Sequence, residues 1–348
     1  MDVVQLSDAR LEELIGRFVQ ARIVVLGDFS LDKYLDIDPA LVEVSLETGK
    51  RAHQVVASRC SPGAAGTVVC NLAALGAGQL HAVGFTGDDG EGFDLRQELS
   101  RLGCSTDHLR VAGDRRTPTY LKPRDVCGAS LAAEHSRYDT KNRCTTPPAL
   151  EQAVIASLDQ LLPCADAVIV LDQVEEADCG VVTQSVRELV ADRARKHRQT
   201  VFWADSRRRI RQFSEVIVKP NQFEAVGNDD PHPGDVVAIE ELVAAADTLR
   251  AKNGAPVVVT CGPAGMIVSD PQWTRIPGVQ IGGEIDPTGA GDSATAGAVL
   301  ALCAGATLPE AALVGNLVAS ITIQQIGTTG VARPDQLPGQ LRVWHTQR

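Results

Sequence analysis

The sequence predicts an α/β protein that carries a small β-sheet lid, and three observations support this. Residues 22–27 form a short apolar run that ends in glycine, which is typical of a buried strand. From about residue 149 onwards, helical segments alternate with short apolar strands, as in βαβ units. Residues 34–61 and 115–138 contain strand-like stretches outside this alternation, and we assign these strands to an appended lid.

The first half of the chain opens with an amphipathic helix, because Leu11, Leu14 and Phe18 share one helical face. A later helix starts at a glycine-rich turn and ends at Gly76. The lid strands are predicted from polar and apolar residues that alternate. The predicted helices cover residues 1–20, 67–75 and 91–102, the buried strands 22–27 and 80–85, and the lid strands 41–46, 54–57, 117–122 and 131–138.

In the second half, helices and strands alternate regularly. Runs of valine and isoleucine mark the buried strands. A run of small and apolar residues without a helix breaker follows the glycines near residue 290 and predicts a buried helix. The predicted helices cover 149–161, 178–197, 236–252 and 309–325, and strands are expected over 166–171, 200–204 and 256–260 and at the start of 215–224.

Size and charge restrict the possible functions. The 348 residues suffice for one large α/β domain or two smaller ones with a sizeable core. Apolar residues make up 44% and charged residues 22%, as in ordinary globular proteins. The net charge of −11 argues against general binding to nucleic acid or to an anionic membrane, because both need a basic face.

The cysteines and the N-terminus indicate the compartment. Nine cysteines are scattered and form no Cys-x-x-Cys pair, which favours free thiols in a reducing environment over disulfides or a zinc site. The N-terminus has no cationic region followed by an apolar one, so no signal peptide is expected. No uncharged apolar run approaches the ~20 residues that a spanning helix needs. We therefore expect a cytoplasmic protein.

The most informative stretch is Asp-Pro-Thr-Gly-Ala-Gly-Asp-Ser, residues 286–293. Its two glycines form a tight turn that leads into the buried helix, so the free N–H groups at the helix start can surround a phosphate. Asp292 then lies at the mouth of an anion site, where a carboxylate can accept the proton of an attacking hydroxyl. The alternative is an ordinary turn in which Asp292 or Ser293 caps the helix.

A second glycine-rich turn, Ser-Pro-Gly-Ala-Ala-Gly at residues 61–66, also starts a helix, so the backbone can approach a ligand closely. By itself this turn is weak evidence for a binding site, because tightly packed helices use the same small residues. The turn at residues 261–265 could offer donors to nucleotide phosphates, or could be a plain hairpin. The cations Lys122, Arg124 and Arg137 are candidate sugar or phosphate contacts, although each alone is more often a solvated side chain.

Together these stretches resemble the ribokinase-like (PfkB) carbohydrate kinases. The stretch at 286–293 resembles the C-terminal signature of that family, and Pro62, Gly63 and the Asn-x-Ala-x-Leu-Gly tail at 71–76 resemble its N-terminal one. Asn221 and Glu224 match an Asn-x-x-Glu element, and Thr260, Gly262 and Gly265 match a Thr-x-Gly…Gly element. The resemblance covers roughly residues 20–332.

The resemblance implies one ribokinase-like domain over residues 1–348: a three-layer sandwich with a central, mostly parallel sheet and a β-sheet lid that often pairs two copies. It implies ATP-dependent phosphorylation of a sugar hydroxyl, with Asp292 as the general base and the N–H groups of Gly289, Ala290, Gly291 and Asp292 as the anion hole. The implied sugar contacts are Asp28, Asp32, Gly63, Ala64, Thr67, Lys122, Arg137 and Asp172. The implied nucleotide contacts are Lys219, Asn221, Thr260, Gly262, Gly265, Thr288 and Asn316.

The same resemblance implies a bound metal. Asn221 and Glu224 would orient Mg²⁺, mostly through water, since oxygen ligands suit this ion. Backbone oxygens near Asp286 could hold K⁺. The alternative for Glu224 is a first-turn carboxylate favoured by the helix dipole, and the alternative for Asn316 is a helix-packing contact.

Within the family the chain is most similar to the D-glycero-β-D-manno-heptose 7-phosphate kinases, through Gly-Asp-x-x-Leu-Asp-x-Tyr at residues 27–34 and the stretch at 221–225. It differs in carrying Thr67 where that subfamily places asparagine and in a longer, cation-bearing segment over 47–59. Since the sequence ends shortly after the kinase signature, we expect no fused nucleotidyltransferase domain. The resemblance therefore leaves several sugars as candidate substrates.

The sequence also bears on rival functions. A dinucleotide-dependent oxidoreductase needs Gly-x-Gly-x-x-Gly after an early strand, whereas this chain has Gly27-Asp28-Phe29 there. A P-loop kinase needs Gly-x₄-Gly-Lys-Ser/Thr, which does not occur. A kinase for another sugar or a nucleoside, or a sugar- or nucleotide-binding sensor on the same fold, remains the alternative; an eroded Gly-Ala-Gly-Asp would mark the sensor, and here the element is intact.

Overall fold

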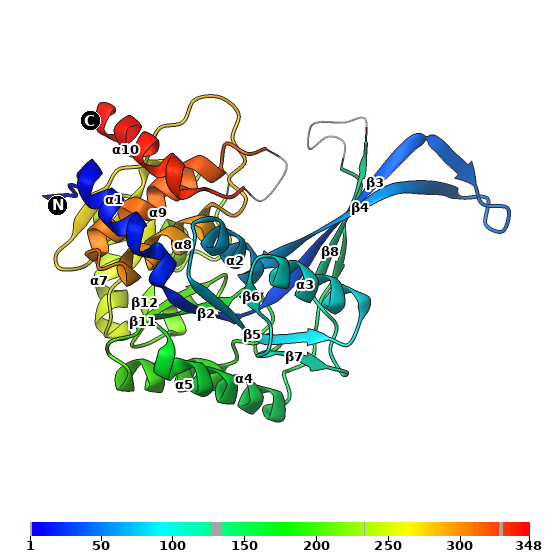
Figure 1. The fold of residues 1–348 in the computed structure, drawn as a ribbon, viewed down its shortest axis with the longest axis horizontal. Helices are drawn as coiled ribbons and strands as arrows, with labels where there is room; N and C mark the ends of the chain where they lie inside the picture. The colour runs from blue at the N-terminus through cyan, green and yellow to red at the C-terminus, as the bar shows by residue number, and fades with distance from the viewer. Residues whose placement is uncertain (1, 127–133, 233, 327–329) are drawn as a thin grey trace.

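The computed structural model describes residues 2–126, 134–232, 234–326 and 330–348. A twisted central sheet lies between two layers of helices, and a second sheet projects from one end (Figure 1). In the described part of the chain, no helix combines the length and apolar character that crossing a bilayer requires.

The central sheet has only parallel strand pairs, as expected for strands joined through helices. Its strand β2 continues almost directly into the lid. In spatial order the strands are β12 (Ile217–Val218), β11 (Val201–Ser206), β10 (Ala167–Asp172), β2 (Arg22–Gly27), β5 (Gln79–Gly87) and β6 (Cys104–Ser105), with β7 (Leu109–Ala112) also paired to β5.

A four-stranded sheet extends the central one beyond β12. Two isolated parallel bridges, Val218 to Val257 and Asn221 to Thr260, join the two sheets. Residues 261–265 form the turn of an antiparallel hairpin in this sheet, as in the second of the two alternatives given for this turn. Its strands are β13 (Val258–Thr260), β14 (Met266–Val268), β15 (Thr274–Ile276) and β1 (Asp2–Val3).

Alternate residues of β2 enter two different cores, because side chains of a strand point to opposite faces. Ile23 and Val25 pack in one core and Val24 and Leu26 in the other. The first core contains α1 (Asp8–Arg17), α2 (Ala65–Ala74), α3 (Gly90–Arg101), α8 (Ala290–Cys303), α9 (Leu308–Thr322) and α10 (Leu337–Thr346). The second contains α4 (Pro148–Leu161), α5 (Gln184–Lys196), α6 (Gln222–Val226) and α7 (Ile239–Asn253).

The predicted lid is present as a separate four-stranded sheet (Figure 1). Its two longest strands form a hairpin that extends far from the body. In spatial order the strands are β4 (Arg51–Ala64), β3 (Phe29–Val44), β8 (Thr119–Asp125) and β9 (Tyr138–Thr140). The lid therefore starts and ends closer to the body than the predicted 34–61, and part of the strand expected at 131–138 lies outside the described residues.

Several predicted boundaries were wrong. The helix expected from residue 178 begins at Gln184, because the preceding residues form a loop that packs on the end of β2. The first helix begins at Asp8, where Ser7 caps it, and not at residue 1. The C-terminal helix α10 was not predicted; it buries Leu337, Leu341 and Trp344.

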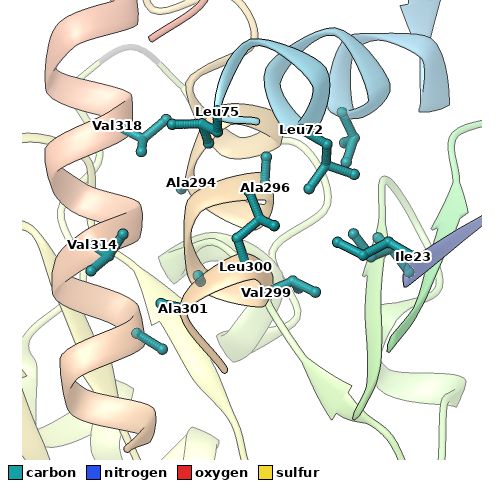
Figure 2. Close-up of a cluster of buried hydrophobic side chains, with 14 of the residues drawn as sticks. Ile23, Leu72, Leu75, Ala294, Ala296, Val299, Leu300, Ala301, Val314 and Val318 are labelled. Carbon is teal, nitrogen blue, oxygen red and sulfur yellow. The ribbon is translucent and has the colours of Figure 1, made fainter. Parts of the chain in front are cut away.

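Helix α8 lies deep in the first core between α9 and α2. Figure 2 shows Ala294, Ala296 and Leu300 of α8 among Val314 and Val318 of α9 and Leu72 and Leu75 at the end of α2. The close approach of α8 and α9 depends on glycine, because a Cβ atom at Gly315 would lie 2.6 Å from the Ala294 oxygen. Small residues thus let the start of α8 reach the sheet edge at a fixed position.

We predict that Gly315→Ala destabilises the fold by roughly 1–3 kcal/mol, because the added methyl group forces α8 and α9 apart. Urea unfolding followed by circular dichroism measures this. The matched control is Gly16→Ala, at an exposed position of α1 where no atom lies within 4 Å of the built Cβ. Since alanine favours helix, the control should gain up to about 1 kcal/mol; equal effects of the two changes would contradict the packing argument.

Candidate active site

A polar cavity of about 300 Å³ lies at the carboxyl ends of the central strands, next to the start of α8. Open α/β sheets bind ligands at this edge. Its walls come from the ends of β11 and β13, the loops after the central strands and the starts of α6 and α8. The lining residues are Gln173, Asp205, Arg207, Lys219, Asn221, Glu224, Thr260, Pro287, Gly289, Ala290, Gly291 and Asp292.

The start of α8 offers backbone donors to this cavity. Gly289 precedes the helix with φ of 76°, a left-handed conformation that favours glycine. The Ala290 N–H is engaged, since it donates to the Pro287 oxygen at 3.1 Å. In the described residues, the N–H groups of Gly289, Gly291 and Asp292 have no acceptor. Three of the four predicted donors are thus free to bind an anion, and Ala290 is not.

Asp292 lies in the first turn of α8 and is half-buried. Burial raises the pKa of its carboxyl group to about 7, and the negative charge of Asp205 adds to the rise, while Lys219 and Arg207 oppose it. A carboxylate is normally stabilised at a helix N-terminus, so burial and Asp205 outweigh that effect here. At neutral pH the group is therefore poised between its acid and base forms.

Lys219 is the buried cation of the site. Its Nζ lies 2.8 Å from the Asp205 Oδ2, and both side chains are almost fully buried. A Cβ atom at Gly291 would lie 3.3 Å from this Nζ, so the ammonium group reaches close to the first turn of α8. The site therefore places a positive charge beside the free N–H groups.

Asn221 and Glu224 form a capping box at the start of α6. The Asn221 amide oxygen accepts the N–H groups of Phe223 and Glu224 at 2.8 and 2.9 Å, and the Glu224 Oε2 accepts the Asn221 N–H at 2.7 Å. Both residues line the cavity, but the amide oxygen of Asn221 is already engaged. Burial first, and then the charge of Asp205, raises the pKa of Glu224 to about 7.

At the base of the lid, the predicted sugar contacts Asp32, Gly63 and Lys122 meet. The Asp32 carboxylate on β3 forms an ion pair with Lys122, in which the Lys122 Nζ lies 3.2 Å from the Asp32 Oδ1. A Cβ atom at Gly63 would lie 3.3 Å from the Asp32 Oδ2 and 2.6 Å from the Ser30 Oγ, which explains the glycine. The Ser30 hydroxyl is buried and has no hydrogen-bond partner among the described residues.

The turn into α2 holds two more predicted contacts. Ala64 has φ of 53° and ψ of −118°, a conformation that costs an alanine on the order of 1–3 kcal/mol. Strain of this kind persists where the surrounding structure enforces it, often at binding sites. Thr67 follows in the first turn of α2 and is buried. The structure thus brings the Gly63 turn and Asp32 together on one side of the lid base.

Other predicted contacts are placed differently. Asp172 is 1% exposed and paired with Arg209, whose Nε lies 3.0 Å from the Asp172 Oδ2, so its carboxylate is not available to a sugar. Asp28 is 5% exposed, and backbone amides occupy its carboxylate. Arg137 pairs with Asp139 at 2.7 Å on the exposed edge strand of the lid.

On the nucleotide side, Thr260 lines the cavity, while Gly262, Gly265 and Thr288 do not. Gly265 is required by packing, because a Cβ there would lie 2.1 Å from the Ile276 oxygen. The Asn316 Nδ2 donates to the Ile276 and Pro277 oxygens at 3.3 Å, which is the helix-packing alternative.

Four lining residues were missing from the predicted site: Gln173, Asp205, Arg207 and Pro287, the last of which belongs to the signature stretch 286–293. Asp205, near the end of β11, forms an ion pair with Lys219, which directly follows β12; the sequence alone does not connect these two residues. Arg207 follows β11, and its guanidinium reaches the Glu175 carboxylate at 3.7 Å. Gln173 follows β10 directly and carried no motif.

Comparison with known proteins identifies the family. A model described as "pfkB family carbohydrate kinase" matches residues 20–335, which is most of the chain. The chain belongs to this family.

Curated relatives include the bifunctional protein HldE of Caulobacter sp. (strain K31), 31% identical over 337 residues that cover 95% of this chain and 65% of the relative. HldE of Gluconobacter oxydans (strain 621H) is 28% identical over 333 residues, covering 92% and 65%. The chain thus spans about 65% of the length of these relatives.

Solved structures show that the fold is ribokinase-like. The phosphofructokinase-2 of Escherichia coli in complex with potassium superposes with a TM-score of 0.67 at 17% identity, covering 94% of this chain and 99% of that one. Ribokinase of Arabidopsis thaliana with ribose and ATP gives 0.63 at 16% identity, covering 93% and 98%. The predicted carbohydrate-kinase family and the ribokinase-like fold are therefore confirmed.

We predict that Asp205→Asn lowers the pKa of Asp292 by about one pH unit or more, because the substitution removes a nearby negative charge and releases Lys219 from its partner. A ¹³C NMR titration of the side-chain carboxyl carbons measures this, with Asp292→Asn to assign the signal. As a control, Asp270→Asn breaks an ion pair with the distant Arg250 and should leave the titration midpoint near 7. An unchanged midpoint in Asp205→Asn would disprove the coupling.

Proposed function

We propose that the protein transfers the γ-phosphoryl group of ATP to a hydroxyl of a sugar or sugar phosphate, with Asp292 as the general base. The observation that carries the proposal is the arrangement at the start of α8. A carboxyl group with a pKa near 7, free backbone N–H groups and the ammonium of Lys219 converge on one cavity. Family membership supplies the reaction class, and this arrangement supplies the residues.

The proton step depends on Asp292. As the acceptor oxygen approaches the phosphorus, its proton passes to the Asp292 carboxylate, and the bond to the ADP oxygen breaks. A base works best when its pKa is close to the working pH, because it is then both sufficiently ionised and sufficiently basic. Burial and Asp205 provide this match.

The charge of the transferring group is stabilised by donors that are already in place. Phosphoryl transfer spreads negative charge over the equatorial oxygens, so positioned donors account for much of the catalysis. The N–H groups of Gly291 and Asp292 and the Lys219 ammonium are suited to this role. Lys219 would exchange part of its interaction with Asp205 for the phosphate.

The donor set also fits Mg²⁺ bound with retained water. No cluster of three or more His, Cys, Asp or Glu ligands occurs among the described residues. We therefore propose a site in which water supplies most of the ligands of the ion. Asp205 and Glu224 are half-buried carboxylates. Burial first, and then repulsion from Asp205, raises the pKa of Glu224, and a hydrated divalent ion would relieve this repulsion. Mg²⁺ would neutralise charge on the nucleotide phosphates. Asn221 would contribute by holding Glu224, because its own oxygen caps α6.

For K⁺ we propose the loop at Asp286, as predicted. The Asp286 N–H donates to the Ile323 oxygen at 2.8 Å, and its carboxylate accepts the Thr288 N–H at 3.0 Å, so the loop is fixed beside the end of α9. The potassium complex of E. coli phosphofructokinase-2, a protein of the same fold, supports this proposal.

We place the sugar between Asp292 and the lid base. Asp32 and Lys122 offer an acceptor and a donor there, and the unpartnered Ser30 hydroxyl suits a sugar hydroxyl. Similarity to the HldE proteins makes a heptose 7-phosphate the first candidate substrate, and fructose, ribose or adenosine type substrates are the alternatives. A non-catalytic sensor is disfavoured by the intact base and anion hole.

We predict that Asp292→Asn lowers kcat by about 10²–10⁴-fold while ATP binding is largely kept, because only the proton acceptor is lost. The measurement is ADP release with Mg-ATP over heptose 7-phosphate, fructose, ribose, fructose 6-phosphate and adenosine, in KCl and in NaCl. Asp8→Asn, an exposed change in α1, serves as the control with full activity. A variant that retains most of its kcat on a substrate of the wild type would rule out Asp292 as the base.

We further propose that the lid pairs two copies of the chain. Strand β8 pairs with β3 as far as Ile37, so within the described residues the outer hairpin consists of two strands without a third neighbour. Two-stranded hairpins are marginally stable in water by themselves. This hairpin also exposes large apolar side chains, namely Leu41, Val44, Leu46, Val55 and Val56, at 48% exposure or more. A second copy would cover them with the same surface, as a two-fold interface requires.

We predict that Val44→Asp weakens self-association by at least about tenfold, because a two-fold interface would contain two buried aspartates. Sedimentation velocity over a concentration series measures the dissociation constant. Val19→Asp is a matched control on the body, since Val19 is 67% exposed and Val44 is 65% exposed. If wild type sediments as a monomer, or if both variants dissociate equally, the lid interface is wrong.

A further inference from the structure

Asp28 connects the core to the lid, because it is the single residue between strand β2 and strand β3. Its side chain is 5% exposed and does not face solvent. The carboxylate instead points at the loop over residues 173–181, which follows β10 and precedes α5. A buried acid at a junction of core and lid, without a cation in contact, needs an explanation.

Both ends of this loop bind the carboxylate of Asp28. The Oδ2 accepts the N–H groups of Gln173 at 2.8 Å and Val174 at 3.1 Å. The Oδ1 accepts the Val181 N–H at 2.6 Å. A Cβ atom at Gly180 would lie 2.5 Å from that Oδ1, so the close approach depends on glycine. The carboxylate thus ties the loop to the end of β2.

The surrounding charges do not compensate Asp28. Asp172 faces it from β10, and the nearby Arg209 is committed to Asp172. Lys141, Glu175 and Glu176 line the small cavity next to Asp28. Burial, with the charge of Asp172, raises the pKa of Asp28 to about 6, against the effect of the three N–H donors. The structure keeps a charge here at a cost.

The loop matters because Gln173 reaches two cavities. It lines the polar active-site cavity of about 300 Å³ and also a smaller one of about 40 Å³ beside Tyr120 of the lid strand β8. Of the described residues, it alone lines both. Gln173 therefore stands between the start of α8 and the lid, where the acceptor sugar is proposed to lie.

We propose that Asp28 is a positioning residue for the acceptor substrate: its ionised carboxylate fixes the 173–181 loop so that the Gln173 amide contacts the sugar. The inference rests on the proposed kinase function and goes beyond it by assigning recognition to Gln173. Because Asp28 acts through backbone amides and not by touching the sugar, its loss should affect substrate binding more than turnover.

The proposal predicts a pH effect on substrate affinity with a defined sign. Only the ionised carboxylate can accept from both sides, because a protonated oxygen becomes a donor. As the pH falls through about 6, Asp28 takes up a proton and the loop loosens. The KM of the acceptor should then rise, while loss of kcat at low pH reports the separate base Asp292.

The kinetic test is a double-mutant cycle with Asp28→Asn and Gln173→Ala. Each variant should raise the KM of the acceptor by about tenfold, with kcat and the KM of ATP within about threefold of wild type. The double variant should be no worse than either single one, since both remove the same contact. Asp28→Asn should also lose the rise in KM below pH 6. Additive effects, or an equal effect on both substrates, would overturn the proposal.

Hydrogen exchange tests the anchor without turnover. Protection of the Gln173, Val174 and Val181 amides should fall at least about tenfold in Asp28→Asn, and in Gly180→Ala, where the added methyl group displaces the same loop. Amides of β10 should keep their protection, which shows that the variants fold. Unchanged protection in both variants would refute the anchor. If protection falls but wild type phosphorylates no sugar, the anchor stands and the kinase proposal fails.

Discussion

One buried ammonium group facing three carboxylates determines the electrostatics of the site. Lys219 contacts Asp205 directly, and Glu224 and Asp292 also act on it. Burial disfavours the ionised carboxylates and the charge of Asp205 adds to this effect, while Lys219 and, for Asp292, Arg207 do not offset it, so the pKa values of Glu224 and Asp292 rise to about 7. The same imbalance that makes Asp292 a moderately strong base would also attract a hydrated metal ion. Base strength and metal affinity thus have one physical origin.

The position of this charge cluster depends on backbone geometry rather than on side-chain contacts of Asp292. Helix α8 is lined with alanine and glycine, which lets it pass between α9 and α2 with its first turn at the sheet edge (Figure 2). Gly289 ends the preceding loop in a left-handed conformation, and Gly291 leaves room for the Lys219 ammonium. A bulkier residue at any of these positions would shift donors relative to the phosphate. Since positioned donors act only when their distances are held, the small residues would serve the proposed phosphoryl transfer by fixing these donors.

The sequence alone predicted what local chemistry decides. The glycine-rich start of α8, the helix start at Asn221 and Glu224 and the presence of a lid followed from the sequence, because glycine conformations, helix starts and strand alternation are local properties; the bounds of the lid strands differed from those expected. Failures occurred where a side chain depends on a partner distant in sequence. Asp28 and Asp172 both follow the strand edge that binds ligands, yet one accepts three amides of a loop 145 or more residues away and the other pairs with Arg209. The late start of α5 has the same cause, because residues 173–181 are held by Asp28 instead of entering the helix.

The choice of aspartate at position 28 follows from this geometry. Three N–H groups approach from two directions, and the two oxygens of a carboxylate can accept all of them. Asparagine offers one accepting oxygen and would set its NH₂ group against an N–H donor, and serine is too short to reach both ends of the loop. Keeping the charge costs free energy, since burial opposes ionisation. A buried charge that lowers stability is expected where holding the loop in position serves function. This is what we expect of a residue that serves substrate recognition rather than folding.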